Sequence, residues 1–206
     1  MENIIINFIS FYFRPILSLL VLLGILVYFL SKKKLPSQKF LFYCLVVFSL
    51  ILIFRSFLLS FLNWYFWSQK ETTRYLLPPY NPISYVLKYS WYHYFFEVII
   101  TLVFGWLVFF FIKLFNNKFE GSLFYEEEKY LAALGILATG WPNCLIYLFL
   151  VLFLGVFFHL IHIVFNSLVR APFRLSLLYF WLPCSLIVLF LSGIINQYIG
   201  ITQLNI

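Results

Sequence analysis

Three charged residues lie inside long apolar runs: Arg14, Arg55 and Glu97. At about 1.5 Å per helical residue, Arg14 lies roughly 27 Å from the lysines at 32–34. Arg55 lies about 24 Å from Lys39, which opens its run, and Glu97 lies about 24 Å from Lys113, which closes its run. The three charges therefore share a depth. Charges inside a membrane usually face the bundle interior and pair with one another. We predict an Arg55–Glu97 ion pair, with Arg14 as a further cation that meets a lipid phosphate or an anionic ligand. The alternative is a purely structural pair and an arginine whose head reaches the interface.

Two histidines, His159 and His162, are three residues apart and share one helix face. Imidazoles at this spacing can hold a metal ion or relay protons. A metal site needs more ligands, and no carboxylate accompanies the pair in its own helix. We interpret them as core histidines that bond across helices, and we expect neither a metal nor a cofactor.

A run of three carboxylates, residues 126–128, directly precedes an apolar helix. Negative charge at a helix N-terminus is stabilised by the helix dipole. That explanation suffices for the run, with a cation site or a partner contact as the alternative.

The elements that position these residues must lie in lipid. The chain has 206 residues, of which 64% are hydrophobic and only 10% charged, whereas soluble domains carry about 25% charged residues. The net charge of +7 does not indicate nucleic-acid binding, because the basic residues form short clusters that punctuate the apolar runs, as in topology signals. The composition predicts an integral membrane protein of a cell membrane or an organellar inner membrane.

We predict an all-α, polytopic transmembrane bundle in a single domain with about six spans. The predicted spans are residues 4–30, 40–62, 94–114, 127–139, 144–168 and 175–195. The fourth is short because the break at 140–143 contains Pro142. It either crosses or re-enters on the side it came from, and the positive-inside rule favours crossing, because Arg170 and Arg174 then share a side with the lysine clusters. Pro183 predicts a kink in the last span.

Residues 63–93 are predicted to form an outer loop crowded with tyrosine and tryptophan, which favour the membrane–water interface. Three prolines hold its middle extended, and residues 83–91 are predicted to form a short interfacial helix.

The short fourth helix is rich in small residues. Ala132, Gly135 and Thr139 follow a small-residue spacing that lets helices approach closely in lipid. We predict that this helix is the most tightly packed one, or that it faces another copy or another subunit.

Two resemblances accompany these patterns. Residues 126–135, Glu-Glu-Glu-Lys-Tyr-Leu-Ala-Ala-Leu-Gly, look like the second motif of the type IV prepilin peptidases, which implies an intramembrane aspartic peptidase. The chain contains no aspartate, and the predicted topology separates Glu71 from Glu127, so we reject that activity. The layout of residues 81–168, with Asn81-Pro82 before a span, Gly121-Ser122 in a loop and a small-residue helix ending at Pro142, resembles the Yip family of multispanning proteins. That resemblance implies a non-enzymatic scaffold.

The sequence favours a non-catalytic scaffold or accessory subunit of a larger membrane complex. Its expected partners are the bilayer, other membrane subunits and a bound lipid, but no nucleic acid. A small transporter or channel element that uses Arg14, Arg55 and Glu97 is the alternative. A membrane enzyme comes third, because no paired acid–base or nucleophile motif is evident.

Overall fold

The computed structural model describes residues 8–32, 35–119, 124–165 and 177–198, and every regular element within these ranges is a helix. Four stretches are long and apolar enough to cross a membrane: Phe13–Lys32, Gln38–Gln69, Ile83–Lys118 and Asn143–Ile161. The elements in chain order are η1 (Phe8–Tyr12), α2 (Phe13–Lys32), α3 (Gln38–Gln69), α4 (Glu71–Arg74), α5 (Ile83–Ser90), η2 (Trp91–Phe95), α6 (Phe96–Lys118), α7 (Glu128–Thr139), α8 (Asn143–Phe165) and α9 (Leu178–Tyr198).

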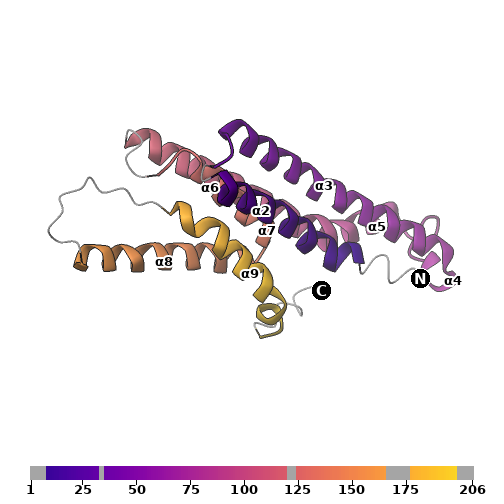
Figure 1. Ribbon diagram of the computed structural model, residues 1–206. Helices are drawn as coiled ribbons and strands as arrows, with labels where there is room; N and C mark the ends of the chain where they lie inside the picture. Colours follow the sequence, from indigo (N-terminus) through magenta and orange to yellow (C-terminus); the bar gives the residue numbers. More distant parts are fainter. Residues whose placement is uncertain (1–7, 33–34, 120–123, 166–176, 199–206) are drawn as a thin grey trace.

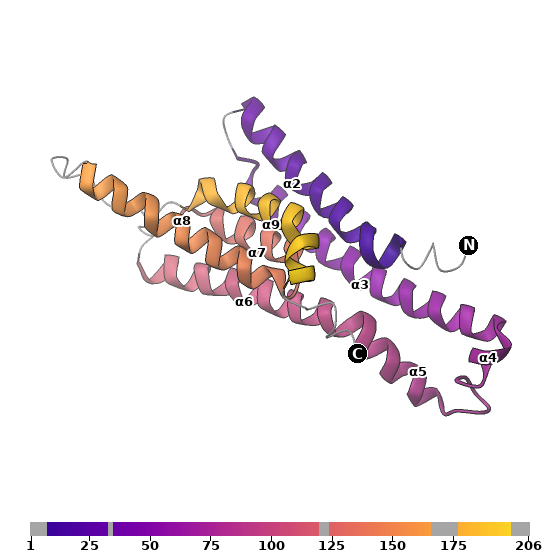
Figure 2. The same cartoon turned by 90° about the horizontal axis from the view of Figure 1, so that it is seen from below.

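The long helices lie side by side with alternating directions (Figures 1 and 2). The end of α2, the start of α3 and the end of α6 lie toward the same end of the bundle, which carries Lys32, Lys39 and Lys113. We call it the lysine end.

At the opposite end, α3, α4 and α5 project as an arm (Figure 2). The helix α3 continues to Gln69, because no proline or glycine interrupts it, so the turn begins later than the predicted loop boundary at residue 63. A helix is present at the predicted residues 83–91 as α5, but it runs through the π-helical turn η2 into α6 and is continuous with that long helix. We call residues 63–93 the aromatic arm.

The core of the bundle is α7. Its residues Leu131–Thr139 are all buried, and it packs on α2, α3, α6, α8 and α9. A helix that is apolar all round is expected to be buried all round. Our alternative prediction, that α7 faces another copy or another subunit, is wrong because the chain's own helices enclose it.

α7 and α8 form an antiparallel hairpin. Asn116 near the end of α6 donates to Glu126 just before α7 (2.9 Å), and the α7 residue Leu137 lies against Gly105 in the middle of α6. After the turn at residues 140–142, α8 runs back along α7, with Tyr147 against Gly135. The end of α8 therefore points toward the lysine end (Figure 2).

The predicted count of six spans is not confirmed. The 12 residues of α7 reach only about 18 Å, less than the roughly 30 Å of a hydrocarbon core. Its turn lies beside Thr101 of α6, because the Trp141 amide donates to the Thr101 hydroxyl (3.0 Å). The hairpin places the turn between α7 and α8 beside α6, and the described residues support four candidate spans. Arg170 and Arg174, on which the positive-inside argument depended, lie outside the described residues.

The last helix, α9, begins at the lysine end, packs mainly on α7 and α8, and contains Pro183. It changes direction along its length (Figure 2), as the predicted kink requires.

Candidate functional site

The most polar place inside the bundle is the end of α7. Arg14 of α2 is only 7% exposed. Its guanidinium forms an ion pair with Glu97 of α6 and donates to the Leu137 carbonyl (3.0 Å). It also covers Gly140, where any Cβ would overlap its atoms. We call Arg14, Glu97, the Leu137 carbonyl and Gly140 the arginine clamp.

The clamp provides hydrogen-bond donors for backbone carbonyls at the end of α7, which the apolar interior would otherwise leave without partners. The last carbonyls of a helix have no partner within the helix, and its C-terminus carries partial negative charge. Arg14 binds one of these carbonyls, and Ser18 donates to another, that of Ala138 (3.2 Å). Gly140 ends the helix with φ of 74°, a conformation that favours glycine.

The predicted partner of Glu97 was Arg55, but the ion pair observed for Glu97 is with Arg14. Arg14 is therefore not the surplus cation that we expected. The Nε of Arg55 donates to the Ile9 carbonyl (2.9 Å), and Arg55 lies within electrostatic range of both Arg14 and Glu97. The structure thus brings the three predicted residues together with a different pairing.

Two hydroxyl residues beside the clamp also bind the end of α7 or the turn that follows it, and sequence reasoning missed both. Ser18 follows Arg14 by four residues on α2, and Thr101 follows Glu97 by four residues on α6. Residues four apart share a helix face. The same spacing of one charged and one hydroxyl residue occurs in both helices. This repeated pattern could have identified the faces of α2 and α6 that meet the end of α7.

Two polar atoms near the turn have no hydrogen-bond partner within the described residues. They are Nε of Arg14 and Oδ1 of Asn143, the first residue of α8. The carboxylate of Glu97, in contrast, is 47% exposed on the outside of the bundle. The clamp therefore connects a buried cation to an anion at the protein surface.

The start of α7 is fixed by a second polar cluster. Glu128 is fully buried, and its carboxylate accepts from the Trp181 indole (3.1 Å) and the Tyr125 amide (3.2 Å). Its neighbour Glu126 pairs with Lys129, whose side chain is only 11% exposed, and Lys129 and Asn116 hold the pKa of Glu126 below its usual value. The helix-dipole explanation of the carboxylate run missed Trp181, which is distant in sequence.

The small residues of α7 are enclosed within the bundle. Ala132, Gly135 and Thr139 are buried. A Cβ on Gly135 would overlap the Tyr147 hydroxyl, so the close approach is to α8 of the same chain. His159 is half-buried on α8, whereas the side chain of His162 lies outside the described residues.

The described residues contain no group of three or more His, Cys, Asp or Glu side chains that could hold a metal ion. No family model, no characterised protein and no solved structure matches the chain.

Proposed function

We propose that the chain is an integral membrane protein that acts without catalysis, as a scaffold or accessory subunit of a larger membrane assembly. The lysine end faces the cytoplasm or matrix, and the aromatic arm faces the opposite side. The α7–α8 hairpin enters from the lysine end and returns to it.

The use of Arg14 carries this proposal. Its guanidinium pairs with Glu97 of α6 and binds a carbonyl at the end of α7. Because Arg14 itself belongs to α2, these contacts hold α2, α6 and α7 together. Glu128 fastens the other end of α7 to α9 in the same way, by accepting from the Trp181 indole. Charges that fasten helices support a structural role more than a reactive one.

The outer side of α8 supports a role in assembly. Among the other helices, α8 packs mainly on α7 and α9. Phe149, Phe153 and Phe157 form a stacked row along it, with ring centroids 6.0 and 6.2 Å apart. All three are about half exposed or more. Such a row offers a neighbouring membrane helix the close van der Waals contact that drives association in lipid.

The test is the mass of the native assembly after mild detergent extraction. We expect a species larger than one 24.7 kDa chain that contains a stoichiometric second polypeptide. The triple change to leucine at Phe149, Phe153 and Phe157 should release that polypeptide. The matched control changes three exposed phenylalanines of α3 (Phe54, Phe57 and Phe61) to leucine and should leave the assembly intact. A wild-type chain that runs alone would contradict the proposal.

One observation favours the transporter or channel element as a second candidate. The break between α7 and α8 lies beside Arg14 and Glu97, and two polar atoms there have no partner among the residues that the structure describes. Interrupted helices beside buried charges are typical of substrate sites in transporters. Anion flux into proteoliposomes that Arg14→Leu abolishes, without loss of the fold, would support this candidate against the scaffold.

A further inference from the structure

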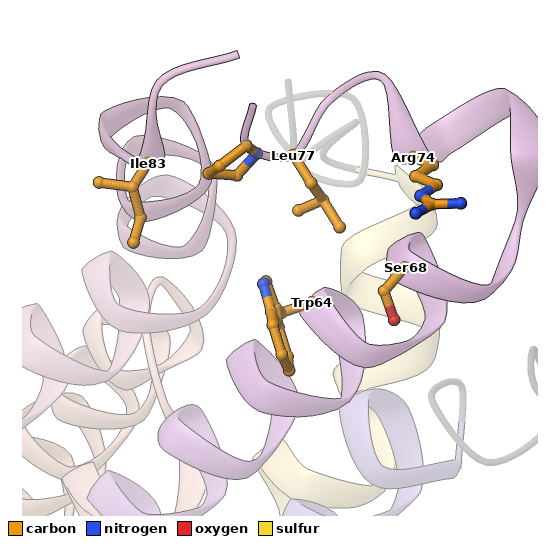
Figure 3. Close-up of a pocket in the computed structure, with 6 residues that line it drawn as sticks. Trp64, Ser68, Arg74, Leu77 and Ile83 are labelled. Atoms are coloured by element: carbon orange, nitrogen blue, oxygen red, sulfur yellow. The ribbon is translucent and has the colours of Figure 1, made fainter. Parts of the chain in front are cut away.

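The aromatic arm contains a pocket of about 380 Å³, within the usual range for small-molecule sites. Its walls are Trp64 and Ser68 of α3, Arg74 of α4, Leu77 and Pro78 of the following turn, and Ile83 of α5. In Figure 3, Trp64 and Leu77 face each other across the space, the indole nitrogen points toward the turn, and Arg74 lies at the rim above Ser68.

Hydrogen bonds within the arm fix the elements that line the pocket. The Thr73 hydroxyl donates to the Trp67 carbonyl (3.2 Å) and ties α4 to α3. The Asn81 side chain donates to the Tyr75 carbonyl (2.8 Å) and closes the turn. Leu77 is only 5% exposed and anchors the turn between the helices. The elements around the pocket are therefore tied to one another.

The pocket combines an apolar floor with two polar donors at its edge. Leu77, Pro78, Ile83 and the indole face are apolar, while Arg74 offers a charged fork and Trp64 an indole N–H. Arg74 takes part in no ion pair within the described residues. A guanidinium fork matches the oxygens of a phosphate, and an indole suits a site that is apolar on one side and wet on the other.

The charge of the arm points to an anionic ligand. Residues 63–93 contain Lys70, Arg74 and Lys88 against Glu71 as the sole acidic residue. This excess of cations lies on the side of the membrane that the positive-inside rule leaves poor in basic residues. A site for negative charge accounts for it.

The position of the pocket along α3 points to a lipid. Trp64 follows Lys39 by 25 residues, or about 37 Å of helix. A hydrocarbon core is about 30 Å thick and the headgroup layers bring the bilayer to about 40–45 Å. With Lys39 at the inner boundary, Trp64 lies at the depth of the opposite headgroups.

We propose that this pocket binds the headgroup of an anionic phospholipid from the leaflet opposite the lysine end. Arg74 and the Trp64 indole contact the phosphate, and Leu77, Pro78 and Ile83 cover the start of the acyl chains. A zwitterionic headgroup binds more weakly, because its outer cation meets the positive arm. The inference rests on the proposed membrane placement.

The test is a titration of the full chain, in a nonionic detergent, with dihexanoylphosphatidylglycerol, followed by microscale thermophoresis. We expect saturable binding that Arg74→Gln weakens about tenfold. The matched control Lys88→Gln removes one charge from the same arm outside the pocket and should change the affinity less than about twofold. Arg74 is exposed on a single-turn helix, and an unchanged melting temperature verifies that its variant folds.

Four results would overturn the proposal: no saturable binding, equal affinity for dihexanoylphosphatidylcholine, equal weakening by Arg74→Gln and Lys88→Gln, or full displacement of the lipid by millimolar inorganic phosphate. The last would identify a site for free phosphate. The titration uses the purified chain alone and therefore requires no partner subunit. Failure of the assembly test therefore leaves the lipid result intact, and the reverse also holds.

Discussion

The two limbs of the hairpin differ in a way that hydropathy alone does not explain. α7 is buried on every side, although it contains a charged first turn and many small residues. α8 is a longer and almost wholly apolar helix, yet most of its outer side is exposed. In lipid, apolar side chains gain little by leaving their surroundings, so the packing that small residues permit decides which helix is enclosed.

The two limbs also differ in their polar contacts. α7 is fastened at one end by Arg14 and Ser18 and at the other by Trp181. The outer side of α8 carries stacked phenylalanines instead. We conclude that α7 organises the bundle and that α8 is the limb whose outer side the described helices leave exposed.

The largest expected effect comes from removing the counter-ion of the clamp. Glu97→Leu leaves the buried Arg14 charge without its partner and should lower the free energy of unfolding by about 3–5 kcal/mol. The double change Arg14→Leu/Glu97→Leu should cost less, because no charge is left unpaired. Unfolding in mixed detergent–SDS micelles measures both.

The control for that experiment is an exposed carboxylate of the aromatic arm. Glu71→Gln on α4 removes a charge from the protein surface and should cost less than about 1 kcal/mol. Equal losses in the single and double clamp variants would show that Arg14 and Glu97 are not coupled, and α7 would then be held by packing alone.

The next effect comes from filling the contact between the two limbs. Gly135→Leu places a side chain where the Tyr147 hydroxyl lies, and overpacking of this kind costs about 1–3 kcal/mol. Gly24→Leu on α2 is the matched control, because nothing lies within 4 Å of a Cβ built at Gly24. Similar melting temperatures for the two variants would mean that α7 and α8 are not in close contact.

A smaller effect of the opposite sign is expected at Tyr147. Its side chain is fully buried, and its hydroxyl has no hydrogen-bond partner within the described residues. Tyr147→Phe removes this unsatisfied group and should raise the free energy of unfolding by about 1 kcal/mol. A loss of stability in the same unfolding assay would show that the hydroxyl has a partner in the bundle.

The smallest effect on the fold is expected on the outer side of α8. Phe153 is 55% exposed, so Phe153→Leu should change the free energy of unfolding of the isolated chain by less than about 0.5 kcal/mol. Its effect should appear in the mass of the native assembly. A large loss of stability in the isolated chain would place this side of α8 against the bundle and end the contrast between the limbs.

Much of this fold follows from the sequence. Each predicted span contains an observed helix, because runs of apolar residues between basic clusters and prolines leave few alternatives. The three intramembrane charges were found in the same way, from their cost in lipid. The predicted pairing of Glu97 with Arg55 was wrong, because Glu97 pairs with Arg14. Rise along a helix gives the depth of Arg14, Arg55 and Glu97, but it does not say which helices are neighbours.

The hairpin escaped prediction for a related reason. Pro142 indicates a break, and 12 residues indicate a short helix, but the direction of α8 depends on contacts between distant residues. Tyr147 against Gly135 and Trp181 against Glu128 decide it. The role of Trp181 carried no local signal, since tryptophan in an apolar run has many explanations.

The most direct test of the account is the side of the membrane reached by three single cysteines in a background without Cys44, Cys144 and Cys184. Lys118→Cys marks the end of α6, Phe165→Cys the end of α8, and Tyr80→Cys the aromatic arm. An impermeant maleimide should label positions 118 and 165 from the same side and position 80 from the other. Labelling of 118 and 165 from opposite sides would show that α8 crosses away from the lysine end, and the hairpin around which this account is built would be wrong.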